Sequence, residues 1–200
     1  MASNAPETTA GSAPALISNT PVPVLMLRGS AALSPFRQER FMSRLRAALP
    51  LIETVYAEYR HFAALTQELS APELGVLERL LTYGPKLESH APQGDLLLVV
   101  PRLGTISPWS TKATDIAQHC TLKKVRRLER GVAWFVSKRG GAAMTADERR
   151  QVAALVHDRM TESVLAGFDE AAALFRVENP APLSTVDVLS GGQGALVAAN

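Results

Sequence analysis

The part of the sequence richest in side chains that can do chemistry covers residues 102–116, which read RLGTISPWSTKATDI. A connection that only reverses the chain is usually built from Gly, Pro, Asn and Asp. This one also gathers hydroxyls, a lysine and a tryptophan, and loops are where ligand- and partner-binding groups concentrate. The pattern therefore indicates an interface or substrate-proximal loop, with a capped loop anchored by its tryptophan as the alternative. The candidate residues are Thr105, Ser107, Trp109, Ser110, Lys112, Thr114 and Asp115.

Two signatures of nucleotide binding are incomplete in this sequence. Gly192 and Gly194 begin a dinucleotide-binding pattern, but Val197 stands where its third glycine belongs. The phosphate loop G-x-x-x-x-G-K-S/T does not occur in the sequence, so ATP binding by these residues has no local support. The sequence therefore predicts that this chain binds no nucleotide by itself.

The candidate nucleophiles and metal ligands also lack their partners. Ser110 and Lys112 are two positions apart, whereas a Ser-x-x-Lys nucleophile needs three. Cys120 is the single cysteine, and with four scattered histidines it shows no zinc-binding spacing. We interpret His61, which lies within a predicted strand, as a packed residue rather than a catalyst. The sequence therefore predicts no catalytic residue, no metal site and no bound cofactor in this chain.

The composition is that of an ordinary globular protein with one domain or two small ones. Of its 200 residues, 46% are apolar and 20% are charged, and the 21 basic and 19 acidic side chains are too evenly balanced to indicate a nucleic-acid partner. No apolar run approaches the ~18 residues that a membrane span needs. A single cysteine cannot form an internal disulfide, which fits a reducing compartment. We therefore expect a cytoplasmic protein with no nucleic-acid or membrane partner.

Three predicted elements position the candidate loop. The continuous apolar run at residues 96–100 predicts a strand buried on both faces before the loop. A short helix is expected at residues 111–120, followed by a long strand at residues 122–136 whose leading half is basic. Such a basic run is typical of a solvated edge, with an anion-facing or interdomain surface as the alternative.

The rest of the sequence alternates between strand and helix patterns, which indicates an α+β fold with helices over one sheet face. Ser34 followed by Pro35 predicts a helix start, and residues 70–73 and 145–148 read as capping boxes. Residues 1–21 carry almost no charge and are expected to form a disordered lead. The predicted strands are residues 22–27, 51–63 and 186–189, and the predicted helices are residues 34–49, one from residue 70 and one from 145 through 168.

Several segments resemble, in order, the N-terminal region of the long-chain phosphoribosylformylglycinamidine synthase (formylglycinamide ribonucleotide amidotransferase) family. They are LRGSAALSPFR, YAEYRHFA, LERLLTYGP, SHAPQGDLLLVVPR, GTISPWSTKATDIAQHC, VRRLERGVAWFV, HDRMTESV and VDVLSGGQGAL. The resemblance covers about residues 25–200, and the TISPWS-x-KATDI string carries most of its specificity. This sequence departs mildly from the family pattern at Leu103, at Thr111 and at residues 119–121.

The resemblance implies a ferredoxin-like, pseudo-duplicated domain, similar to the small accessory subunit of multi-subunit versions of the enzyme, at residues 22–140. The start of a helical linker domain would follow at residues 145–200. The family's synthetase and glutaminase domains lie outside this sequence, and the helical pattern begun at Ala195 is cut at Asn200, as we expect for part of a longer chain.

The resemblance also implies a function for the parent protein. The family converts formylglycinamide ribonucleotide, ATP and glutamine to the amidine in de novo purine biosynthesis, as a carbon–nitrogen ligase that uses ATP and magnesium. This chain alone is then expected to be inactive. Its role would be to brace the synthetase and glutaminase domains of the same polypeptide, which are its expected partners. The alternative function is a stand-alone ligand- or anion-binding module that uses the Trp109 loop.

Overall fold

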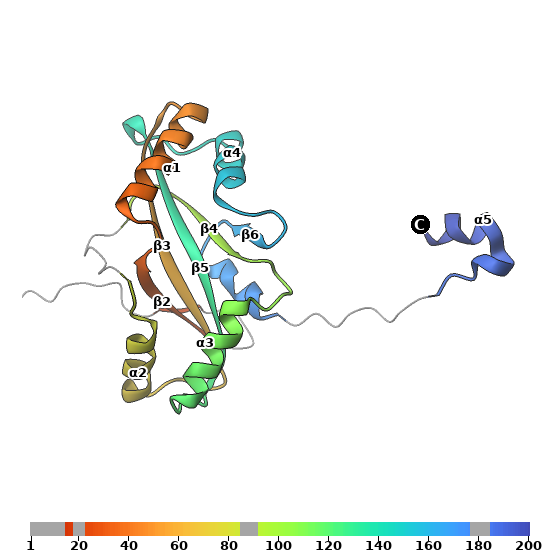
Figure 1. Ribbon diagram of the computed structural model, residues 1–200, viewed down its shortest axis with the longest axis horizontal. Coiled ribbons are helices and arrows are strands. Elements are labelled where there is room, and N and C mark those ends of the chain that lie inside the picture. The colour runs from red at the N-terminus through yellow and green to blue at the C-terminus, as the bar shows by residue number, and fades with distance from the viewer. Residues whose placement is uncertain (1–14, 18–22, 85–91, 177–184) are drawn as a thin grey trace, which may run out of the picture.

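The computed structural model describes residues 15–17, 23–84, 92–176 and 185–200 of the chain. Within them, six strands form one antiparallel sheet in the order β1-β2-β3-β5-β4-β6, and helices pack on it (Figure 1). This is the α+β class that the sequence predicts, and it is compatible with a ferredoxin-like fold. The strands are β1 (Ala15–Ile17), β2 (Val24–Ala31), β3 (Ile52–Leu65), β4 (Asp95–Pro101), β5 (Val125–Lys138) and β6 (Glu162–Leu165).

The two central strands, β3 and β5, are each 14 residues long and pair with each other from end to end. Both are rich in β-branched and aromatic residues, which favour a pleated and half-buried backbone. At ~3.3 Å per residue, a strand of this length spans about 46 Å. An α-helix of 14 residues spans only about 21 Å. Helices must therefore be placed end to end to cover such a sheet.

Two pairs of helices cover opposite ends of one sheet face (Figure 1). The first pair is α1 (Pro35–Ala48) and α4 (Ala146–Val156), and the second is α2 (Ala71–Leu81) and α3 (Pro108–His119). Each pair has its own apolar cluster with the strands, so the helix-covered face carries two cores rather than one. These clusters include Leu45, Val55, Trp134 and Val152 under the first pair, and Ala63, Leu77, Ala117 and Leu128 under the second.

The starts of α1, α2 and α4 confirm the caps predicted from the sequence. The hydroxyl of Ser34 accepts a hydrogen bond from the backbone amide of Arg37 at 3.4 Å. Reciprocal capping boxes open α2 and α4, and these caps satisfy amides that have no partner within their helices. Their members are Ser70 with Glu73 and Thr145 with Glu148.

The opposite sheet face is covered in part by η2 (Asp169–Phe175), a 3₁₀ segment. Its buried residues pack against Phe62 and Leu98 of the sheet. On this face the fully buried carboxylate of Glu58 pairs with the guanidinium groups of Arg28, at 2.7 Å, and Arg60. The Arg60 guanidinium also lies over the Phe168 ring, with 4.7 Å from its carbon to the ring centroid. Buried ions need such partners to offset the loss of hydration.

The prediction of one helix from residue 145 through residue 168 is wrong. The helix α4 ends at Val156, η2 is a later separate segment, and between them β6 adds to the sheet edge beside β4. The apolar spacing that continues past Val156 is overridden by a local turn, because the Asp158 carboxylate accepts the amide of Met160 at 2.7 Å. Short polar side chains that bond nearby amides in this way compete with helix formation.

Two further predictions are corrected at the ends of the chain. Part of the expected disordered lead forms β1, which pairs with β2; residues 1–14 and 18–21 lie outside the described residues. The expected strand at residues 186–189 is replaced by the start of α5 (Val188–Ala199). This start is capped by Asp187, whose carboxylate accepts the Ser190 amide at 3.1 Å. Local capping decides the element here, because the apolar run is too short to distinguish a strand from a helix.

The segment after residue 145 is attached to the same sheet as the segment before it. β6 pairs with β4, and Val152 of α4 is buried against strand residues. The division into a domain at residues 22–140 and a linker domain at residues 145–200 therefore stays a prediction. Among the described helices, none is both long enough and apolar enough to span a membrane.

The packing of β2 against β3 generates a first prediction, on two glycines. A Cβ at Gly29 would lie 2.6 Å from His61 Cε1, so Gly29→Ala should reduce the free energy of unfolding by about 1–3 kcal/mol. Gly75, inside α2, has room for a Cβ, with the nearest atom 3.6 Å away. Gly75→Ala should therefore raise that free energy by about 0.5–1 kcal/mol. Urea unfolding of both variants checks this, and equal effects at the two sites would contradict it.

Candidate functional site

The loop between β4 and α3 ends in the cap of α3. Ser107 is the N-cap residue, and its hydroxyl accepts the amide of Ser110 at 3.0 Å. Pro108 takes the first helical position, where its missing N–H group costs nothing. The helix therefore starts three residues before the predicted start at residue 111. The Trp109 side chain thus belongs to the first turn of a helix rather than to a loop.

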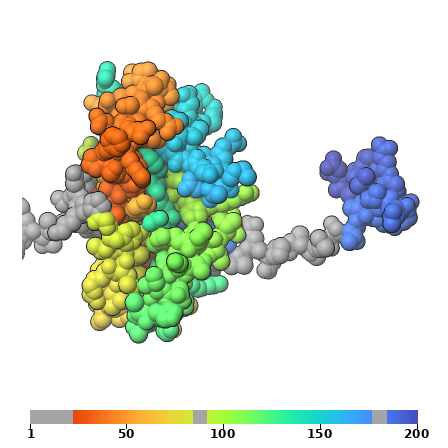
Figure 2. All heavy atoms as spheres, in the orientation of Figure 1, coloured from red at the N-terminus to blue at the C-terminus, as the bar shows by residue number. Residues whose placement is uncertain are grey.

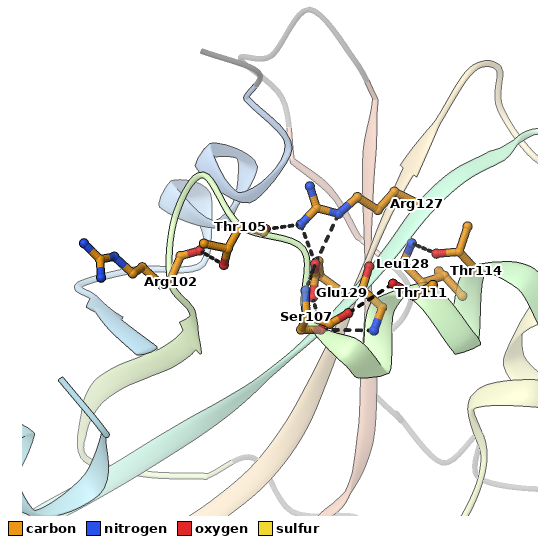
Figure 3. A network of polar contacts seen from close by, with 9 residues as sticks. Arg102, Thr105, Ser107, Thr111, Thr114, Arg127, Leu128 and Glu129 are labelled. Atoms are coloured by element: carbon orange, nitrogen blue, oxygen red, sulfur yellow. Dashed lines mark hydrogen bonds and ion pairs between the residues drawn. The ribbon is translucent and has the colours of Figure 1, made fainter. Parts of the chain in front are cut away.

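Glu129, a fully buried residue of β5, joins this loop to the sheet (Figure 3). Its carboxylate accepts the Ser107 hydroxyl at 2.9 Å and the Nε of Arg127 at 3.1 Å. Arg127 also donates from Nη2 to the carbonyl of Thr105 at 2.7 Å. One buried carboxylate is therefore neutralised by one guanidinium, and the three residues hold the loop in a single position.

The helix α3 takes the place of a neighbouring strand along half of β5. The pairing of β4 with β5 stops at Val99↔Val132, which leaves the first half of β5 without a strand on that side among the described residues. Thr114 fills part of this gap, since its hydroxyl accepts the amide of Leu128 at 2.9 Å (Figure 3). An unpaired edge is a template for aggregation unless it is covered. Thr114 therefore has a structural role here.

The remaining candidate residues divide between the interior and the surface. Ser110 is buried, and its hydroxyl has no hydrogen-bond partner among the described residues. Lys112 and Asp115 are exposed on α3, and the Asp115 carboxylate lies 3.3 Å from His119 Nδ1. The hydroxyl of Thr105 donates to the carbonyl of Arg102 at 2.6 Å. Most of the predicted hydroxyl cluster thus serves the loop's own structure, whereas Lys112 and Asp115 face solvent.

Trp109 belongs to an aromatic and basic group that we call the Arg130 cluster. The Arg130 guanidinium carbon lies 4.4 Å from the Tyr59 ring centroid and 5.0 Å from that of Trp109. Trp109 also stacks on His61, with 5.6 Å between ring centroids. Cation–π contacts of this kind fix the position of a guanidinium group. The members are Tyr59, His61, Tyr83, Trp109 and Arg130.

A chain of hydrogen bonds links Arg130 to His61 through the Tyr83 hydroxyl. Arg130 donates to the Tyr83 hydroxyl at 3.2 Å, and that hydroxyl lies 2.6 Å from His61 Nε2. Arg130 has only donors, so the Tyr83 oxygen accepts the bond from Arg130. Burial, with the Arg130 charge as a second cause, lowers the pKa of His61 to about 3. His61 is therefore a neutral packed residue, in agreement with the sequence interpretation.

A groove of about 660 Å³, which we call the central groove, opens beside the Arg130 cluster. It lies between the two helix pairs, where neither covers the sheet, and Figure 2 shows atoms of β5 in teal at the bottom of this gap. Tyr59, Trp109 and Arg130 line it from the cluster side. The other lining residues that matter here are Pro101, Arg102, Ile106, Pro108, Val132, Met160 and Glu162.

Sequence reasoning did not single out Glu129 or Tyr83, and it noted Arg130 only as part of a basic run. The signal available for Glu129 was a lone acid within that run, which here marks a buried counter-ion. Only the fold brings Glu129 to Ser107 and brings Arg130 and Tyr83 to the Arg130 cluster, because they come from β5 and from the segment after α2.

Among the described residues, the candidate nucleophiles and metal ligands are not assembled into a site. Within residues 15–17, 23–84, 92–176 and 185–200, no group of three or more His, Cys, Asp or Glu side chains is placed to hold a metal ion. Cys120 is a half-buried free thiol at the end of α3. The prediction that this chain has no cofactor or metal of its own stays a prediction.

Residues 58–175 match the model of a protein family described as formylglycinamide ribonucleotide amidotransferase N-terminal. The matched region begins in β3 and ends in η2, so it includes the loop, the Arg130 cluster and the central groove. It covers more than half of the chain.

The Glu129 network generates a second prediction. Glu129→Gln keeps the size of the side chain but directs an N–H group at Arg127 or Ser107, so buried donors lose their acceptor. We expect the free energy of unfolding to fall by about 2–4 kcal/mol. Glu68→Gln, at an exposed position, is the matched control and should change it by less than about 0.5 kcal/mol. A neutral result for Glu129→Gln in chemical denaturation would contradict the role given to the carboxylate.

The lowered pKa of His61 generates a third prediction, on pH dependence. Between pH 6.5 and about 3 the unfolded chain binds a proton at His61 and the folded chain does not. Stability is therefore lost as the pH falls from 6.5, with a slope that reaches about 1.4 kcal/mol per pH unit. His61→Phe should reduce this slope, even if it lowers stability at neutral pH. Denaturant titrations between pH 7 and 4 measure it, and identical slopes in both proteins would show that His61 does not contribute.

Proposed function

The chain belongs to the formylglycinamide ribonucleotide amidotransferase N-terminal family, and from this we propose that it is the N-terminal part of a carbon–nitrogen ligase. The family ties it to the amidotransferase of purine biosynthesis. The parent enzyme would convert formylglycinamide ribonucleotide to the amidine in the cytoplasm, with glutamine as the amido donor and with ATP and magnesium bound by its synthetase domain. Residues of this chain would hold neither cofactor.

Within that enzyme, this part would assemble the catalytic domains and would not catalyse a step itself. The observation that carries this proposal is how the loop hydroxyls are used. Ser107 and Thr114 hold α3 against β5, while polar and apolar groups of the same segment remain at the surface. A loop fixed from within and presented outward is suited to docking, because little conformational freedom is lost on binding.

The proposed partners are the synthetase and glutaminase domains of the same polypeptide. Residues 105–115 would face the synthetase domain, with the Trp109 ring as the apolar contact and Lys112 as the polar one. This chain would hold the synthetase and glutaminase domains in a fixed relative position, so that ammonia released from glutamine reaches the synthetase site. Trp109 also packs on His61 within this domain, so its removal should affect stability as well as docking.

Lys112 therefore gives the cleaner test and a fourth prediction. The catalytic part of the enzyme, expressed without this chain, is mixed with wild-type chain, and amidine formation from formylglycinamide ribonucleotide, ATP and glutamine is measured. We expect activity only in the mixture, and Lys112→Ala should reduce it several-fold, as for a contact worth about 1 kcal/mol. Lys123→Ala, another exposed lysine, is the matched control and should leave activity unchanged.

Two outcomes would contradict the proposed function. One is full activity of the catalytic part without this chain, since no brace would then be needed. The other is amidine formation by this chain alone, because that would require a catalytic site within it. If Lys112→Ala and Lys123→Ala behave alike, the assembly role survives but Lys112 is not a contact.

A further inference from the structure

The central groove is bordered by large apolar side chains that project into solvent. Ile106 is 63% exposed and Met160 is 74% exposed, and both line the groove. A small molecule at the groove floor would leave these side chains in water. Exposed apolar groups gathered around one depression are typical of protein–protein contacts. The shape and rim therefore favour a polypeptide occupant.

Arg130 is one of the charged residues that line the groove, and most of its N–H donors have no partner among the described residues. A guanidinium group has five N–H donors. Among the described residues, the one hydrogen bond found for Arg130 goes to the Tyr83 hydroxyl. The rings of Tyr59 and Trp109 hold the guanidinium in place and keep it half-buried. A fixed guanidinium with free donors accepts a carboxylate through two parallel hydrogen bonds.

The other charges of the groove also favour an acidic occupant. The charged lining residues are Arg102, Arg130 and Glu162, so the formal charge of the groove is +2 − 1 = +1. The Glu162 carboxylate already accepts the backbone amide of Asp158 at 2.8 Å. A basic partner would meet two guanidinium groups and one carboxylate that is engaged elsewhere. An acidic partner is complementary to this arrangement.

From these observations we propose that the central groove docks a polypeptide segment that places a carboxylate on Arg130 and an apolar side chain between Ile106 and Met160. This inference rests on the proposed function, because the segment is taken to come from the catalytic part of the amidotransferase. It deepens that function by assigning a second contact to the uncovered middle of the sheet, in addition to the contact at Lys112.

The test uses two substitutions of one exposed residue, which avoid damage to the core. Wild-type chain and the variants Ile106→Asp and Ile106→Lys are titrated with the separately expressed catalytic part, and the dissociation constant is measured by calorimetry. We expect Ile106→Asp to weaken binding at least tenfold, because it adds a negative charge beside an acidic segment, and Ile106→Lys to weaken it clearly less. Phe36→Asp and Phe36→Lys are the matched controls, since Phe36 is 66% exposed on α1, and both should bind as wild type.

A second measurement addresses Arg130 directly. Arg130→Gln should weaken binding at least tenfold, while Arg130→Lys, which keeps the charge but not the paired donors, should lie between it and wild type. Melting temperatures are recorded for both variants, so that a folding defect is recognised. If Arg130→Gln does not fold, the comparison of Ile106→Asp with Ile106→Lys tests the acidic segment by itself.

The outcomes separate this inference from the proposed function. If the wild-type chain does not bind the catalytic part, both are overturned. If it binds and all Ile106 variants bind equally, only the groove assignment is overturned. Equal loss in Ile106→Asp and Ile106→Lys, or greater loss in Ile106→Lys, would overturn the acidic segment. Sedimentation measures whether the chain associates with itself. If it does, and if Ile106→Asp abolishes this association, the occupant of the groove is a second copy of the chain and the proposed acidic segment is overturned.

Discussion

The pairing of two 14-residue strands, β3 and β5, is the constraint on which the rest of this structure depends. Strands of that length cannot be covered by one helix, so α1 with α4 and α2 with α3 are placed at opposite ends of one face. Each pair buries its own apolar cluster, and the middle of the face stays open between them. The central groove is a consequence of this length mismatch rather than of any local motif.

The same pairing explains why a short segment gathers so many hydroxyls. β4 accompanies β5 along only part of its length, and the other part needs hydrogen-bond partners. Thr114 and Gln118 of α3 supply two of them, at the Leu128 amide and the Val125 carbonyl. The cap at Ser107 and the buried Glu129 fix the start of α3 beside the groove. The hydroxyls of Ser107 and Thr114 therefore have structural roles, whereas Lys112 and Asp115 of the same segment face outward.

Burial and charge also give two members of the Arg130 cluster different roles: His61 is a packed structural residue, and Arg130 can bind a partner. His61 is kept neutral by burial and by the nearby guanidinium, and it gives Trp109 a surface to stack on. Arg130 remains charged and half-buried, with most of its donors directed to no described residue. The rings of Tyr59 and Trp109 hold the guanidinium in place, and an anionic partner would add paired hydrogen bonds to it.

The features of this protein that depend on a few neighbouring residues could be predicted from the sequence. The caps at Ser34, Ser70 and Thr145, the β-branched long strands and the family-specific string at residues 105–116 were all readable, because capping and periodicity act over a few residues. Two features were decided by tertiary structure: the addition of β6 to the sheet, and the meeting of Trp109 with Arg130 and of Ser107 with Glu129. Their partners lie far apart along the chain, and no spacing within one segment reports which strand will lie beside which, or which acid in a basic run will be buried as its counter-ion.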